Sequence, residues 1–243
     1  MPSWQTIQKE TEELQCVVKG DDGSSALIYS SGANRLVRAI RSDGICVTAG
    51  LDDGNPWGAA TKEAEGPLEY VDGFTADYVQ NIWFQYAAPL FAAFQFVGPE
   101  TLFGPLTQWD WDGVKMTGDK IVLTKNVEGL GLTTMTVFVD PKNRYRVTKW
   151  SHDIGTPGVY RGSVTYDGDG VIPKRVEGYN PIADLTVRWD VSDVKKCERT
   201  DFGPQSIGAE NAPLRRWQWI AIGACGTCVL ALLGWGLLRK GDN

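Results

Sequence analysis

The chain has 243 residues, of which 42% are hydrophobic and 22% charged, and its formal net charge is −6. This composition is typical of a globular protein and excludes disordered, collagen-like and coiled-coil chains. The negative charge repels phosphate backbones, so we expect no nucleic-acid partner. His152 is the only histidine in the sequence, which leaves little for histidine-rich metal sites or hydrolase triads.

The N-terminal segment shows the spacing of a helix. Trp4, Ile7 and Leu14 recur at near-helical intervals among charged residues, which predicts one short amphipathic helix. The segment contains no apolar core of the length that a secretory signal needs.

Short β-strands joined by turn residues follow on both sides of a central insert. Turn residues at 31–34 and 42–44 separate the first runs, which predicts a meander of hairpins. Val187, Trp189 and Val191 alternate with charged residues, so one face of the predicted sheet is apolar. The predicted strands cover residues 26–30, 35–41, 45–50, 114–118, 120–126, 134–140, 145–152, 160–167, 173–179 and 185–194.

The central insert, Phe74–Val97, has the period of a helix. Val79 and Trp83 lie beside a row of apolar residues at every fourth position: Phe74, Tyr78, Ile82, Tyr86, Leu90 and Phe94. This pattern predicts a buried helical face. Pro89 lies inside this pattern and should break or kink the helix into two pieces. The second piece is apolar on nearly every side but too short to span a bilayer, so we expect another part of the protein to cover it.

The C-terminal segment Trp217–Leu238 contains no charged residue. As a helix it would span roughly 33 Å, which matches the hydrocarbon core of a bilayer. Basic residues flank the segment and tryptophans lie near both of its ends, where they favour the membrane interface. The predicted organisation is a domain at 1–200, a linker at 201–214, a single-pass membrane anchor at 215–240 and a tail at 241–243.

Small residues form a stripe along this predicted anchor. Gly223, Thr227 and Ala231 recur at four-residue spacing, which would let a second helix approach closely and predicts weak self-association. Cys225 and Cys228 form a C-x-x-C pattern, but thiolates are disfavoured inside a bilayer, so we interpret them as packing residues.

The orientation of the predicted anchor stays open, because the basic residues on its two sides balance and the charge rule does not decide. In one arrangement the protein is tail-anchored and its domain is cytoplasmic. In the other, the domain is extracytoplasmic and a signal sequence upstream of Met1 is missing from this chain.

Three motifs are candidates for a chemical site. Residues 109–112 alternate tryptophan and aspartate, but a glycosidase needs carboxylates across a cleft rather than along one strand. Residues 167–170 resemble the start of a calcium loop, yet the twelfth position is Gly178, which favours a hairpin turn. His152 has no nearby serine or cysteine nucleophile signature. We therefore predict no catalytic residue, no metal ligand and no cofactor.

Three cysteines lie outside the predicted anchor: Cys16, Cys46 and Cys197. In an oxidising compartment one disulfide and one buried thiol would fit this odd number. Sequence alone leaves the pairing open.

Three segments carry a resemblance to a known family: WQTIQKETEELQC at the N-terminus, Val137–Trp150 with its Asp-Pro-Lys-Asn turn, and Tyr166–Tyr179. With the order of the predicted elements, they resemble the LolA/LolB-like lipoprotein-carrier superfamily. In that family a strongly curved antiparallel sheet forms an incomplete barrel, lidded by short helices, whose concave apolar face holds acyl chains. The resemblance implies a mainly β fold and an extracytoplasmic, periplasmic domain, while the C-terminal transmembrane helix departs from the family pattern.

The function implied is non-enzymatic binding of a membrane lipid, a lipoprotein acyl chain or another apolar ligand by a domain anchored in the bacterial cell envelope. The lining residues should cluster around the predicted break, where a lid can hinge. They are Trp83, Tyr86, Leu90, Phe91 and Phe94.

Two alternatives stay open. The protein would be a structural or interaction protein of the envelope if its own side chains fill the core. It would be a carbohydrate-active enzyme if Asp110 and Asp112 face each other across a cleft. An apolar cavity favours ligand binding, a packed interior favours the structural role, and facing carboxylates favour the enzyme.

Overall fold

The computed structural model describes residues 13–91, 95–97, 102–105, 111–129, 131–153 and 158–212. The chain divides into two units, residues 1–210 and residues 211–243, and the elements below belong to the first. No helix in the described ranges is long and apolar enough to cross a membrane. Residues 1–12 of the predicted N-terminal helix and the whole predicted anchor lie outside those ranges. Leu14, the last residue of that helical pattern, begins a strand instead of continuing a helix, because it pairs with Lys196.

Strands dominate the first unit. They are β1 (Leu14–Gly20), β2 (Ser25–Ser31), β3 (Asn34–Ile40), β4 (Cys46–Asp52), β5 (Asn55–Ala60), β6 (Glu69–Val71), β7 (Gln95–Val97), β8 (Leu102–Pro105), β9 (Gly113–Thr117), β10 (Lys120–Val127), β11 (Gly131–Asp140), β12 (Arg146–Asp153), β13 (Val159–Tyr166), β14 (Pro173–Asn180) and β15 (Leu185–Lys196). The β7–β8 pair forms a separate two-stranded sheet, and the others form one sheet of 13 strands.

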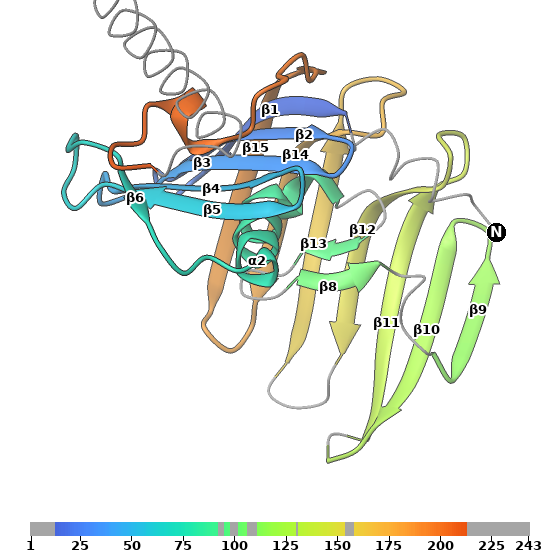
Figure 1. Cartoon of the computed structure of the whole chain (residues 1–243). Coiled ribbons are helices and arrows are strands. Elements are labelled where there is room, and N and C mark those ends of the chain that lie inside the picture. The colour runs from blue at the N-terminus through green and yellow to red at the C-terminus, as the bar shows by residue number, and fades with distance from the viewer. Residues whose placement is uncertain are drawn as a thin grey trace, which may run out of the picture. The chain divides into compact units, whose positions relative to one another are not determined.

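The large sheet consists of two antiparallel meanders, β1–β6 and β9–β15. They join where β1 pairs with β15. The sheet is not closed, because β6 and β9 are its two edges. In Figure 1 the strand direction turns along the sheet, so that β1–β6 run across the view and β9–β11 run steeply. The prediction of a mainly β, antiparallel and unclosed sheet is confirmed.

One face of the sheet, called the inner face here, carries the helix α2 (Ala76–Ala87), which contacts β2–β5. Thr75 caps this helix, because its hydroxyl accepts a hydrogen bond from the Tyr78 N–H at 3.2 Å. The helix ends before Pro89. The 3-10 helix η1 (Ala88–Phe91) follows it and contacts β14 and β15. The predicted break at Pro89 is confirmed.

The predicted end of the helix was wrong, and its predicted buried face was right only in part. Residues 95–97 form β7 rather than helix. The buried stripe runs through Val79, Trp83, Ala87 and Leu90, whereas Tyr78 of the predicted stripe is 53% exposed. Large aromatic residues occur on several sides of this helix, and the smaller Val79 and Ala87 mark the side that lies closest to the sheet.

The chain that follows β15 covers the opposite, outer face of the β1–β6 meander. Phe202 packs with Leu36, Trp57 and Cys197 in a cluster separate from the inner core. The indole N–H of Trp57 donates a hydrogen bond to the Phe202 carbonyl at 2.7 Å. The 3-10 helix η2 (Pro204–Ile207) follows and contacts β5.

This covering segment also closes the β6 edge. The Glu210 N–H donates to the Leu68 carbonyl at 2.8 Å, and the Tyr70 N–H donates to the Glu210 carbonyl at 2.9 Å. Residues 202–210, which the sequence assigns to the linker, therefore pack on the sheet. The reason is that Phe202 and Ile207 supply apolar contacts on the outer face, which turn-rich composition alone does not reveal.

Candidate functional site

Among the described residues, the side chains under α2 pack against one another. Trp83 and Leu90 are almost fully buried in one cluster with residues of β1–β4 and β15, and Tyr86 is half-buried at its margin. Burial raises the pKa of the Tyr86 hydroxyl, so this group stays neutral. The structure thus brings three predicted lining residues together. The side chain of Phe91 and all of Phe94 lie outside the described part of the chain.

The apolar inner face continues past the helices toward the β9 edge. Ile121 and Leu123 of β10 are buried there in a second apolar cluster. Met116 and Val114 of β9 lie opposite them on the same face, since paired residues share a face. Yet Val114 is 51% and Met116 47% exposed. This end of the inner face presents apolar surface that an apolar ligand can cover.

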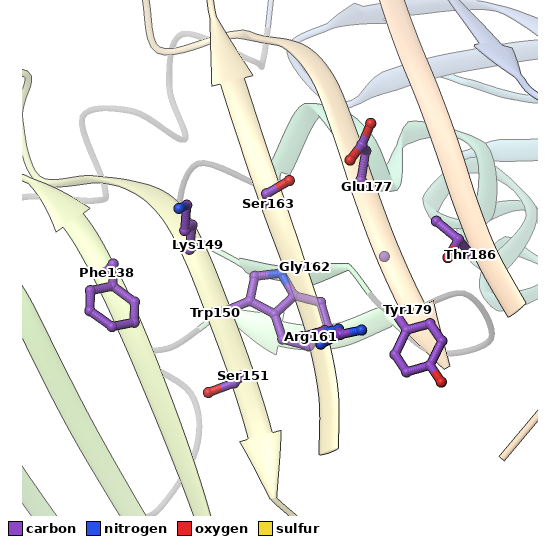
Figure 2. Close-up of a pocket in the computed structure, with 11 residues that line it drawn as sticks. Phe138, Lys149, Trp150, Ser151, Arg161, Gly162, Ser163, Glu177, Tyr179 and Thr186 are labelled. Carbon is purple, nitrogen blue, oxygen red and sulfur yellow. The ribbon is translucent and has the colours of Figure 1, made fainter. Parts of the chain in front are cut away.

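A groove of about 390 Å³ crosses β11–β15 (Figure 2). Two rows of side chains border it. Strand register places Phe138, Lys149, Ser163 and Glu177 in one row. The second row contains Ser151, Arg161, Tyr179 and Thr186. Residues Trp150, Gly162 and Gly178 lie between the rows.

The groove lies on the outer face. Trp150 packs with Val137 in the inner apolar cluster, and successive residues of a strand point to opposite faces. Lys149 and Ser151 therefore point outward, as do the residues paired with them. We call this hollow the outer-face groove.

Two cations, Lys149 and Arg161, and two aromatic rings, Phe138 and Tyr179, line the outer-face groove, and Lys120 lies next to it. The Arg161 guanidinium lies 4.6 Å from the centre of the Tyr179 ring, and the Lys120 ammonium lies 6.0 Å from the Phe138 ring. The Tyr179 hydroxyl is hydrogen-bonded to Asp184 at 3.0 Å, which holds the ring in place. That hydrogen bond also raises the pKa of the Tyr179 hydroxyl.

The one acidic residue that lines the groove is already paired. Glu177 Oε1 lies 2.7 Å from Arg188 Nε. Among the described residues, neither Lys149 nor Arg161 forms an ion pair. The groove is therefore locally cationic in a chain whose net charge is −6.

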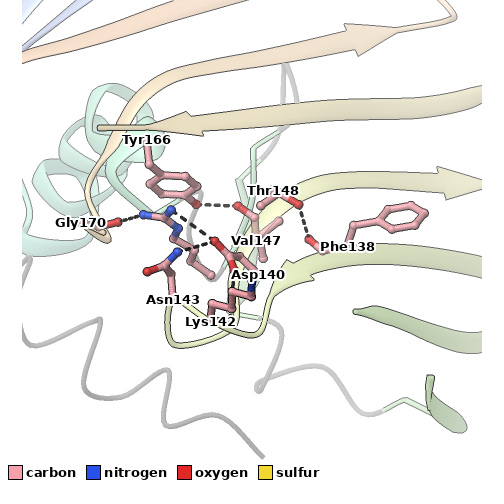
Figure 3. Close-up of polar contacts among 9 residues, drawn as sticks. Phe138, Asp140, Lys142, Asn143, Val147, Thr148, Tyr166 and Gly170 are labelled. Carbon is pink, nitrogen blue, oxygen red and sulfur yellow. Dashed lines mark hydrogen bonds and ion pairs between the residues drawn. The ribbon is translucent and has the colours of Figure 1, made fainter. Parts of the chain in front are cut away.

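A polar cluster links the β11–β12 turn to the β13–β14 turn (Figure 3). Arg146 is buried, donates to the Gly170 carbonyl, and lies 3.4 Å from Asp140 Oδ2. Its guanidinium also stacks 4.2 Å from the centre of the Tyr166 ring. Asn143 donates to Asp140 Oδ2 at 2.6 Å, and this hydrogen bond is the main cause of the lowered pKa of Asp140. Arg146 contacts groups of both turns, so the cluster is a structural tie between two hairpins.

The acidic residues of the candidate motifs that the structure describes form local structural contacts. Asp112 accepts the Asn126 N–H at 2.6 Å across the β9–β10 hairpin, while Asp110 lies outside the described residues. Asp167 lies in the β13–β14 turn and pairs with Lys174 at 2.9 Å. Within the described ranges, no group of three or more histidine, cysteine or acidic residues is arranged to hold a metal ion. His152 is buried in β12, and burial lowers its pKa.

The three cysteines outside the predicted anchor are buried and free: Cys16, Cys46 and Cys197. The interpretation with one disulfide is therefore wrong for this structure. Burial raises the pKa of the Cys16 thiol to about 12, so it stays protonated at neutral pH.

Sequence reasoning missed the outer-face groove. Its signal was present as polar residues at alternate positions, as in Lys149 and Ser151 or Arg161 and Ser163. This alternation predicts a polar face for each strand. It does not predict which polar residues lie opposite one another, since that depends on the register between strands.

No protein-family model and no curated protein matches the sequence. Among solved structures, the chain is similar to a DUF1329 family protein from Desulfovibrio piger, with 8% identity, a TM-score of 0.41, and coverage of 81% of this chain and 91% of that chain. It is also similar to a putative outer membrane lipoprotein-sorting protein domain from Vibrio parahaemolyticus, with 10% identity, a TM-score of 0.38, and coverage of 84% and 94%.

Proposed function

We propose that this protein is a non-enzymatic binding domain of the bacterial cell envelope that holds a lipid, a lipoprotein acyl chain or another apolar ligand on its inner face. The observation that carries the proposal is the half-exposed pair Val114 and Met116, which continues the apolar inner face beyond α2. Covering such a pair removes apolar surface from water, which favours binding by about 25 cal/mol per Å² before ordering costs.

On the helical side, we propose that the residues around Pro89 line the ligand site. Tyr86 is the half-buried member among the described side chains and marks the margin of the core. The full proposed set is Trp83, Tyr86, Leu90, Phe91 and Phe94. Residues Trp83 and Leu90 face the core cluster in this structure, so they would meet a ligand only if the helix moves at the Pro89 break.

The membrane attachment and compartment are part of the same proposal. The uncharged segment Trp217–Leu238 is proposed to anchor the domain. We place the domain on the periplasmic side, following the family resemblance of the sequence. Protease treatment of spheroplasts tests this placement, because a periplasmic domain is digested and a cytoplasmic one is protected.

A second candidate function is that of a structural or interaction protein. The observation that favours it is the nearly complete burial of Trp83 and Leu90, which fill the interior under α2. In that case Val114 and Met116 are the surface that a protein partner covers, and no lipid binds.

Photo-crosslinking of the full-length chain in membranes tests the first candidate. The probe is a neutral fatty alcohol with a diazirine in its chain, and mass spectrometry measures labelling of residues 113–123. Met116→Asp places a charge on the apolar inner face and should lower labelling by about tenfold.

Leu132→Asp is the matched control, because Leu132 is 67% exposed in β11 and lies on the outer face. This variant should label like wild type. Equal labelling of the Met116→Asp protein, or no labelling of wild type at residues 113–123, contradicts lipid binding and favours the structural role.

A further inference from the structure

We infer that the outer-face groove is a binding site for an anionic amphiphile, a phosphate or carboxylate group that carries an apolar chain. The site lies on the face opposite to the proposed apolar site at Val114 and Met116, so it is independent of it. Nothing in the inner-face proposal requires this groove, and either can fail alone.

The charge of the groove selects an anion. Lys149 and Arg161 lie in neighbouring strands, and neither forms an ion pair within the described chain. Glu177 is the one acid lining the groove, and its carboxylate is neutralised by Arg188 at 2.7 Å. The hydroxyls of Ser151 and Ser163 stand beside the two cations in the same rows. Ammonium, guanidinium and hydroxyl donors together form a set that oxygen anions favour.

The rings of the groove select an apolar chain. Phe138 lies at the β11 end and Tyr179 on β14, so a ring lies to each side of the two cations (Figure 2). Phe138 is 36% exposed, so part of its ring is accessible to a ligand. The Tyr179 ring is held by Asp184 and carries the Arg161 guanidinium over it, so a cation and an apolar ring lie together at this end of the groove. Aliphatic groups can lie on such rings while the acidic group meets the cations.

The dimensions agree with a small amphiphile. The groove crosses five neighbouring strands, which gives a length of roughly 19 Å at about 4.8 Å per strand. Its volume of about 390 Å³ falls in the range of small-molecule sites. A nucleic acid would need a longer cationic surface, and the negative net charge of the chain opposes it.

Isothermal titration of the full-length chain in a non-ionic detergent tests the inference with four soluble probes. They are hexyl phosphate, heptanoate, inorganic phosphate and hexyl glucoside. Hexyl phosphate and heptanoate should bind more tightly than both inorganic phosphate and hexyl glucoside, because only they satisfy the cations and the rings together. Their affinity should fall as NaCl is raised, since the cations are exposed.

Substitutions in the groove should change affinity with opposite signs. Lys149→Gln and Arg161→Gln should each weaken hexyl phosphate binding by about threefold to tenfold. Glu177→Gln should strengthen it by about threefold, because an opposing charge is removed. A merely structural role for these residues would not produce a gain in affinity.

Two further variants separate binding in the groove from a general effect of charge and from binding of the anion alone. Lys195→Gln removes an exposed lysine of β15 outside the groove and should leave binding unchanged. Phe138→Ala should weaken hexyl phosphate but not inorganic phosphate. Equal affinity for hexyl phosphate and inorganic phosphate, or equal effects of Lys195→Gln and Lys149→Gln, overturns the inference, as does the absence of binding.

Discussion

The two meanders of the sheet share an architecture but differ on their outer faces. In β1–β6 the outer residues include Leu36 and Trp57, and the segment around Phe202 covers them. In β11–β15 the outer residues include Lys149 and Arg161, and they line an open groove. Both meanders have apolar inner faces. The identity of alternate residues therefore decides whether a hairpin sheet becomes core on both sides or presents a binding surface.

Each meander contains a tryptophan whose indole lies against a glycine of the neighbouring strand: Trp57 on Gly50, and Trp150 on Gly162. The first pair lies on the covered outer face, and the second on the inner face. Within the described part of the chain, the β1–β6 meander is thus packed on both faces, while the β9–β15 meander has its apolar packing on the inner face.

The largest expected effect is on the stability of the doubly covered meander. Trp83→Ala removes a buried ring that joins α2 to the sheet and should lower the free energy of unfolding by about 3–5 kcal/mol. Tyr78→Ala on the same helix is the control and should cost less than about 1 kcal/mol, because Tyr78 is exposed. Urea denaturation measures both. Similar losses for the two variants would mean that α2 is not the inner support of this meander.

An intermediate effect on stability is expected from adding a methyl group at the contact between Gly162 and Trp150 in the second meander. A Cβ at Gly162 would lie 2.5 Å from the Trp150 indole. Gly162→Ala should therefore cost about 1–3 kcal/mol of stability through overpacking. Ser163→Ala changes the next residue, which points to the outer face, and should change stability by less than about 0.5 kcal/mol. If Gly162→Ala is as stable as Ser163→Ala, the inner face of this meander is loosely packed.

The smallest expected effect is a pH dependence in the second meander. Burial lowers the pKa of His152 below its ordinary value of 6.5 in the folded state. The unfolded chain thus takes up the proton first, and stability is lost as the pH falls from above 6.5 through the folded-state pKa. Urea midpoints between pH 7.5 and 5.5 should decrease for wild type and decrease less for His152→Gln. Parallel curves would assign the pH dependence to other groups.

Local patterns were enough to predict most strands. Each hairpin from β9 to β15 combines alternation with turn residues, so the predicted runs agree with the observed strands. Residues 55–60 escaped prediction, because Pro56 and Gly58 obscure the strand pattern. They form β5 through pairing with β4 and through the burial of Trp57, which are long-range contacts that a sequence window does not contain.

The candidate sites depended still more on long-range structure. The helical period placed Trp83 and Leu90 on a helix, yet only the sheet beneath it shows that they face a filled core. The outer-face groove depends on the register of Lys149 opposite Ser163 and Phe138. An irregularity between Phe138 and Val139 shifts the register of β11 against β12. The residue types at this position do not predict such a bulge.

The pairing of β1 with β15 has a consequence for the order of folding. Neighbouring hairpins close short loops and can form while the chain is being made, whereas this seam joins the first strand of the sheet to the last. Until Leu185–Lys196 has emerged from the ribosome, β1 retains an open edge and η1 lacks its contacts with β15. The two meanders can therefore join only after β15 has been synthesised, because its pairing with β1 makes them a single sheet.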